Sequence, residues 1–174
     1  MTSLDQLIAS RLRDVPDFPE PGVLFKDITP LLADAEAFAA CIEALAELPA
    51  AREAQVIAGV EARGFIVAAA LARAVGAGMV PVRKAGKLPP PTVRSSYQLE
   101  YGSAEIEIPT GLLDHRSVFV VDDVLATGGT LAATIELLGQ AGAKVSGVGV
   151  LIELSFLGGR QRLSGWDPTA LLVL

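Results

Sequence analysis

Cysteine, histidine and aromatic residues are scarce in this sequence of 174 residues. It has one cysteine, Cys41, and one histidine, and aromatic residues make up 5% of the chain. A lone cysteine excludes an internal disulfide, which suits a reducing cytosol. Cys41 falls in a helical apolar pattern, so we interpret it as a small core residue rather than a nucleophile.

Long apolar runs are also missing. The longest, residues 65–72, is far shorter than the ~20 residues that a membrane span requires. The first residues include Asp5 and contain no apolar signal core. We therefore expect a cytoplasmic protein with no membrane partner.

Basic residues are outnumbered, with 14 Lys and Arg against 20 Asp and Glu, for a net charge of −6. This balance argues against a broad nucleic-acid surface, and we expect no nucleic-acid partner. The length suits one domain, residues 1–174, which would bury roughly 70% of the surface that its unfolded chain exposes.

Apolar runs of strand length alternate with segments of helical spacing along the chain. We expect strands at residues 55–60, 79–82, 118–121, 145–152 and 170–174, and helices after Ser3 and at 35–48, 64–75, 130–141 and near Arg160. The Pro-rich segment 15–32 has no assigned element. Alternating apolar residues on both sides of Gly102 predict an antiparallel hairpin flap at about 94–109. The order predicts an α/β fold, with a mainly parallel sheet flanked by helices.

Two adjacent acids, Asp122 and Asp123, follow the most apolar strand, at the edge where open α/β sheets bind ligands. Two carboxylates can accept the two O–H groups of a ribose diol. The next residues supply backbone amides, two hydroxyls and two glycines at a helix start, which suits a phosphate: Ala126, Thr127, Gly128, Gly129 and Thr130. A Gly-Gly turn after a strand is by itself as often a structural turn as a phosphate site. The paired acids and the Thr- and Gly-rich turn together predict a ribose 5-phosphate site. No Lys follows the second glycine, so this is not a P-loop.

The segment VVDDVLATGGT resembles the signature of type I phosphoribosyltransferases, which bind 5-phosphoribosyl 1-pyrophosphate (PRPP). Segments 18–27, 61–65, 82–89 and 97–102 narrow the resemblance to the adenine phosphoribosyltransferase family, and it spans residues 16–163. The resemblance implies the type I phosphoribosyltransferase fold. It also implies an enzyme of purine salvage that converts adenine and PRPP to AMP and pyrophosphate, with Mg²⁺ carried by PRPP and no certain metal ligand in the protein.

Two basic segments are candidates for the pyrophosphate of PRPP. Glu61, Ala62 and Arg63 open a helix, where amides and a guanidinium can converge on an anion, although a plain helix cap has the same pattern. The resemblance implies that these residues form the pyrophosphate loop, in which the Glu61–Ala62 peptide can be cis. It also implies that Tyr101 binds the pyrophosphate. The second segment clusters three cations, for which a solvated loop is the ordinary alternative: Arg83, Lys84 and Lys87. The resemblance implies a homodimer in which the loop 83–87 reaches the neighbouring site with at least one of these residues.

The resemblance assigns catalysis to Glu100 and Arg63. Glu100 lies on the flap and has the residue type needed to take a proton from adenine, although an exposed hairpin Glu is the ordinary interpretation. His115 sits in a polar turn and is not expected to be the base.

The resemblance implies an adenine-binding site made by Leu24, Phe25, Lys26 and Leu154. Phe25 would stack on the ring, backbone groups would read its edge, and Leu154 would press from the other face. Core packing is the common role of Phe and Leu. The family usually has Arg where this chain has Lys26, which should matter little if only the backbone is used.

Two alternative functions stay open: a PRPP-sensing regulator without catalysis, and the same reaction on a 6-oxo purine.

Overall fold

The computed structural model describes residues 3–98 and 103–174. Within these residues a seven-stranded sheet has the order β5-β6-β4-β3-β7-β8-β9. Its five parallel strands are β4 (Gly78–Lys84), β3 (Val56–Val60), β7 (Ser117–Leu125), β8 (Lys144–Glu153) and β9 (Thr169–Val173). The antiparallel hairpin of β5 (Thr92–Gln98) and β6 (Ser103–Pro109) pairs with the end of β4. The predicted mainly parallel α/β sheet with a hairpin is therefore confirmed.

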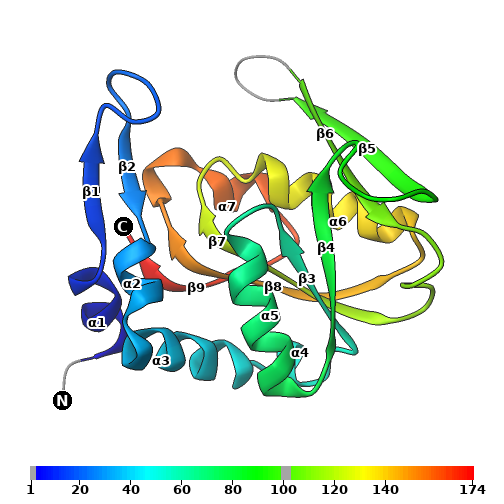
Figure 1. Cartoon of the computed structure of the whole chain (residues 1–174), viewed down its shortest axis with the longest axis horizontal. Coiled ribbons are helices and arrows are strands. Elements are labelled where there is room, and N and C mark those ends of the chain that lie inside the picture. The colour runs from blue at the N-terminus through cyan, green and yellow to red at the C-terminus, as the bar shows by residue number, and fades with distance from the viewer. Residues whose placement is uncertain (1–2, 99–102) are drawn as a thin grey trace.

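Helices cover both faces of the sheet (Figure 1). One apolar cluster joins Phe119 and Val121 to α1 (Leu4–Ser10), α2 (Thr29–Ala33), α3 (Ala35–Ala46) and α5 (Gly64–Val75). The other joins Val118 and Val120 to α6 (Gly129–Gln140). Successive side chains of a strand point to opposite faces, so a strand that is apolar throughout requires a helix layer on each side.

Short elements connect these layers. They are α4 (Pro49–Arg52), the 3-10 turn η1 (Ser155–Leu157) and α7 (Gly159–Arg162). Cys41 is fully buried in α3, which agrees with a core role. No helix in the described ranges is long and apolar enough to cross a membrane.

The segment 15–32, to which the sequence assigned no element, contains regular structure. It contains β2 (Leu24–Asp27), which pairs with β1 (Arg13–Pro16) in a separate two-stranded sheet, and then α2. Lys26 pairs with Asp14 across this N-terminal hairpin, and Arg13 pairs with Asp27. In Figure 1 the N-terminal hairpin and the β5–β6 hairpin rise from the same side of the sheet, at opposite ends of the molecule.

The strand expected at 118–121 is longer than predicted, and it includes both acids. β7 continues through Asp122 and Asp123 to Leu125, because pairing with β8 persists to Leu125 and Glu153. The two carboxylates are therefore fixed by strand geometry rather than carried on a loop.

Candidate active site

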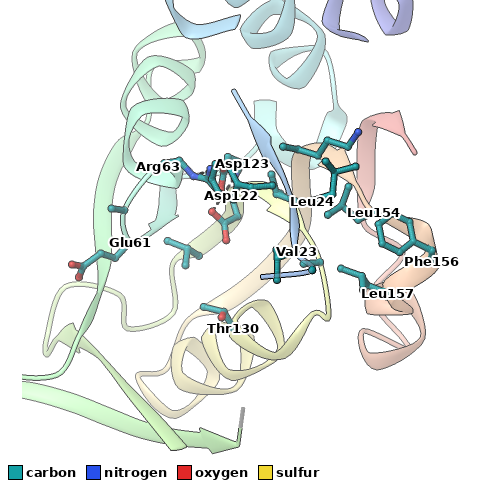
Figure 2. A pocket seen from close by; sticks show the side chains of 17 residues that line it. Val23, Leu24, Glu61, Arg63, Asp122, Asp123, Thr130, Leu154, Phe156 and Leu157 are labelled. Carbon is teal, nitrogen blue, oxygen red and sulfur yellow. Dashed lines mark hydrogen bonds and ion pairs between the residues drawn. The ribbon is translucent and has the colours of Figure 1, made fainter. Parts of the chain in front are cut away.

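A cavity of about 840 Å³ lies between the N-terminal hairpin and the carboxyl ends of β3, β7 and β8 (Figure 2). Its walls unite segments that are distant in sequence. Eleven of the predicted site residues line it: Leu24, Phe25, Lys26, Glu61, Ala62, Arg63, Asp122, Asp123, Ala126, Thr130 and Leu154. The predicted ribose and nucleobase segments therefore share one cavity.

A smaller hollow of about 80 Å³ opens at the start of α6 and is lined by every residue of the predicted phosphate loop, 126–130. Asp122, Val124, Ala126 and Thr130 line both spaces, so the hollow adjoins the larger cavity. Gly128 has a φ of +76°, which glycine adopts without steric cost. Its backbone also approaches the start of α7 closely, since a Cβ on Gly128 would lie 2.6 Å from the carbonyl oxygen of Gly159.

Asp122 and Asp123 present adjacent carboxyl groups to the large cavity. Burial and then repulsion by Asp123 raise the pKa of Asp122 well above its ordinary value. Asp122 Oδ1 accepts a hydrogen bond from the backbone N–H of Asp123 at 2.9 Å. A Cβ on Gly64 would lie 2.8 Å from that oxygen, so glycine lets the start of α5 pack directly on the pair. A raised pKa favours a protonated Asp122, which gives the pair an O–H donor beside its acceptors.

Arg63 links the predicted ribose and nucleobase parts of the cavity. Its Nε lies 2.7 Å from Oδ2 of Asp123, and its guanidinium carbon lies 5.0 Å from the centre of the Phe25 ring. The contact with Asp123 is an ion pair without hydrogen-bond geometry, because Oδ2 accepts no hydrogen bond from the described residues. Oδ2 of Asp123 thus keeps its acceptor capacity, and Arg63 offers a cation over an aromatic face.

The predicted nucleobase part of the cavity comes mainly from the N-terminal hairpin. Phe18 packs edge-on against Phe25, with ring centres 5.1 Å apart. Nζ of Lys26 lies 2.7 Å from Oδ1 of Asp14, so its side chain is already engaged. Leu154, 9% exposed, follows β8 and forms a wall. This arrangement suits a flat apolar ring whose edge meets backbone groups.

Several apolar residues of the cavity were not predicted from the sequence. Leu157 and the 73% exposed Phe156 extend the wall after Leu154, and Val23 faces it from the N-terminal hairpin (Figure 2). The only sequence signal for Phe156 and Leu157 was the mostly apolar segment 154–157, Leu-Ser-Phe-Leu, which resembles an ordinary core segment. Gly22, Val60 and Val124 complete the lining and carry no chemistry-bearing side chain.

The cations of the second predicted pyrophosphate segment do not line this cavity: Arg83, Lys84 and Lys87. Arg83 Nε instead donates to Oε2 of Glu61 at 3.3 Å, and the backbone N–H of Lys84 donates to the same oxygen at 2.9 Å. Burial acts to raise the pKa of Glu61, but these hydrogen bonds and the two cations lower it overall. Glu61 accordingly points away from Asp122 and Asp123 (Figure 2).

Three further predictions concern this region. The Glu61–Ala62 peptide is cis. Glu100 and Tyr101 lie outside the described residues. In residues 3–98 and 103–174, no group of three or more His, Cys, Asp or Glu side chains is placed to hold a metal ion.

Known proteins are similar to this chain in sequence. Residues 27–167 match the phosphoribosyl transferase domain family. The adenine phosphoribosyltransferase of Streptomyces coelicolor is 58% identical over 163 residues, covering 93% of this chain and 90% of that protein. That of Mycolicibacterium vanbaalenii is 54% identical over 173 residues, covering 98% of both.

Solved structures share the fold. Adenine phosphoribosyltransferase from Rhodothermus marinus superposes with a TM-score of 0.93 at 46% identity, covering 98% of each chain. The Saccharomyces cerevisiae enzyme, complexed with adenine and an imino-altritol bisphosphate, gives 0.87 at 37% identity, covering 99% of this chain and 100% of that one. Sequence and fold agree along nearly the whole length, so this chain belongs to the adenine phosphoribosyltransferase family of enzymes.

Proposed function

We propose that this enzyme transfers the 5-phosphoribosyl group of PRPP to adenine in a Mg²⁺-dependent reaction, giving AMP and pyrophosphate for purine salvage. One observation carries the proposal. The hollow at 126–130 adjoins the cavity lined by Asp122, Asp123, Phe25 and Leu154, which supports adjoining sites for a phosphate, a ribose and a base. The yeast relative, which is complexed with adenine, supports the same choice of base.

In the proposed reaction, N9 of adenine bonds to C1′ as the C1′–O bond to pyrophosphate breaks, and pyrophosphate leaves with the bonding electrons. Asp122 and Asp123 hold the ribose hydroxyls, and the amides of 126–130 hold the 5′-phosphate. Arg63 and the cations of 83–87 stabilise the charge that develops on pyrophosphate. Glu100 takes the proton that adenine loses.

Selection of adenine would come from backbone groups of residues 24–26. A 6-amino and a 6-oxo purine exchange donor and acceptor at that edge, so fixed backbone groups accept only one pattern. The pairing of Lys26 with Asp14 supports this, because the side chain is turned to the neighbouring strand. Lysine in place of the usual arginine should then leave base selection unchanged.

Mg²⁺ fits this site as an ion that arrives with PRPP. Glu61 is engaged by Arg83 and Lys84, which leaves Asp122 and Asp123 as the described acids of the cavity that can face an ion or the hydroxyls bound to it. When bound, Mg²⁺ would neutralise charge on the pyrophosphate.

We further propose a cytoplasmic homodimer in which at least one of Arg83, Lys84 and Lys87 reaches the neighbouring subunit's site. The absence of these residues from the lining of the described cavity in their own chain supports this arrangement. The buried, unpaired Cys41 suits a reducing compartment.

The test is pyrophosphate release with PRPP and Mg²⁺, offering adenine, hypoxanthine, guanine and xanthine separately. Turnover with adenine alone is expected. Turnover only with a 6-oxo purine would overturn the assignment of residues 24–26. PRPP binding without turnover on any base would instead favour the alternative function, a PRPP-sensing regulator without catalysis.

A further inference from the structure

Glu107 of β6 is a charged side chain with no exposed surface. Its Oε1 accepts hydrogen bonds from the backbone N–H groups of Lys87 and Leu88, each at 2.7 Å. Its Oε2 accepts from Nε of Arg94 at 3.0 Å and from the hydroxyl of Thr92 at 3.3 Å. One carboxylate therefore ties the loop between β4 and β5 to the β5–β6 hairpin.

Ionisation of Glu107 depends on these donors. Burial alone would raise its pKa, but hydrogen bonds from the backbone of residues 86–88 and the charge of Arg94 outweigh it and lower the pKa to about 2. A buried carboxylate is tolerated only when its acceptor sites are filled, and buried amides likewise need acceptors. The loop and Glu107 thus satisfy each other, and removing the carboxylate leaves the amides of Lys87 and Leu88 without an acceptor.

The loop that Glu107 holds carries the basic cluster. Nη1 of Arg83 donates to the backbone carbonyl of Lys87 at 3.0 Å, which closes the loop, and Nε of the same arginine reaches Glu61. The backbone N–H of Ala85 also donates to the carbonyl of Glu105 on β6 at 2.9 Å. A continuous path of hydrogen bonds therefore runs from Glu107, through the cationic loop, to the Glu61–Ala62 turn at the cavity wall.

We propose that Glu107 is a positioning residue for pyrophosphate binding: it fixes the loop 84–88 so that its cations meet the pyrophosphate of PRPP. This inference rests on the function proposed above and adds a residue to it. Glu107 itself touches no substrate. Because it also belongs to the β5–β6 hairpin, it makes the loop and the base of the flap one connected unit.

Binding of AMP and binding of pyrophosphate, measured separately, distinguish a positioning role of Glu107 from general disruption of the fold. AMP would occupy the cavity and the hollow, and neither is lined by a residue of the loop 84–88. Pyrophosphate would need the loop. We expect Glu107→Gln, which has nearly the same shape but replaces one acceptor oxygen with a donor facing Arg94, to weaken pyrophosphate binding about tenfold or more. Its Kd for AMP should stay within about twofold.

The experiment is calorimetric titration of the full chain with magnesium pyrophosphate and with AMP, for wild type, Glu107→Gln and Glu107→Asp. Glu107→Asp keeps the charge but shortens the reach, so it should fall between the other two. The matched control is Glu105→Gln, on the same strand, whose side chain is 43% exposed and 3.8 Å from Arg94. Both Kd values of this control should equal those of wild type.

Weaker pyrophosphate binding with normal AMP binding supports the inference. Equal loss of both ligands would show general disruption and overturn it, and so would unchanged pyrophosphate binding in both Glu107 variants. Failure of the wild type to bind either ligand would refute the proposed function itself, a result that the variants alone could not produce.

Discussion

Replacing Gly159 by alanine should disturb both halves of the site with one methyl group. Gly159 opens α7, beyond the turn that carries Phe156 and Leu157, and its backbone lies against the strand end that leads into the phosphate loop. A Cβ there would clash with the carbonyl oxygen of Ala126 and lie 2.8 Å from Cδ1 of Leu125. The leucine side chain can rotate, whereas the carbonyl is backbone, so the two segments must separate.

The magnitude follows from this geometry. Overpacking of a dense contact costs about 1–3 kcal/mol, and the gain from replacing glycine in a helix offsets roughly 0.5–1 kcal/mol. We therefore expect Gly159→Ala to lose about 1–2 kcal/mol of unfolding free energy. For a domain of this size that lowers Tm by roughly 2–8 °C. A displacement near 1 Å in a phosphate-binding loop should weaken PRPP binding by about 10- to 100-fold.

Thermal unfolding and PRPP titration measure the two effects. Gly139→Ala is the matched control, because this helical glycine in α6 has nothing within 4 Å of its ideal Cβ. It should keep wild-type PRPP affinity and gain a few tenths of a kcal/mol or more in stability. If Gly159→Ala matched wild type in both Tm and PRPP affinity, the close backbone contact would not exist in solution and the reasoning would fail.

Three other substitutions test separate parts of the site. Glu100→Gln should lower kcat by about 10²–10⁴-fold with PRPP affinity retained in a titration; a near-normal rate would remove Glu100 from the mechanism. Asp123→Asn should weaken PRPP binding by about 10- to 100-fold, since it removes an ionic acceptor and the partner of Arg63; unchanged affinity in the same titration would contradict the ribose assignment. Hydrogen bonds from the hydroxyl and backbone of Thr29 lower the pKa of Asp27 from 3.8 to about 2, so its contribution to stability is complete above about pH 4 and lost as pH falls towards 2. Urea unfolding should show the gap between wild type and Asp27→Asn closing over that range, and a constant gap would exclude this ionisation.

The central strand, the two acids and the following helix were predictable because each leaves a local signal. Val118 to Val121 are apolar on both faces, and the glycines after them mark a turn into a helix. The end of β7 was not predictable in the same way. Asp122 and Asp123 interrupt the apolar pattern, and only pairing with β8 extends the strand through them.

The N-terminal hairpin and Glu107 were missed for a related reason. β1 and β2 have four residues each, and one includes proline, so neither shows a period. Glu107 lies between Ile106 and Ile108, and alternation predicts that it faces solvent. It is instead covered by the loop 86–88, a tertiary contact that no local pattern contains.

The two-stranded sheet of the N-terminal hairpin shares no strand with the main sheet. Residues 22–26, which we propose face the base, therefore lie in or beside this separate sheet, whereas the acids and the proposed phosphate loop belong to the central strand and its helix. We therefore expect that base selectivity and binding of the ribose 5-phosphate group can be altered independently. A chimera that exchanges residues 13–27 with those of a relative of different base preference would transplant selectivity and leave the catalytic framework untouched.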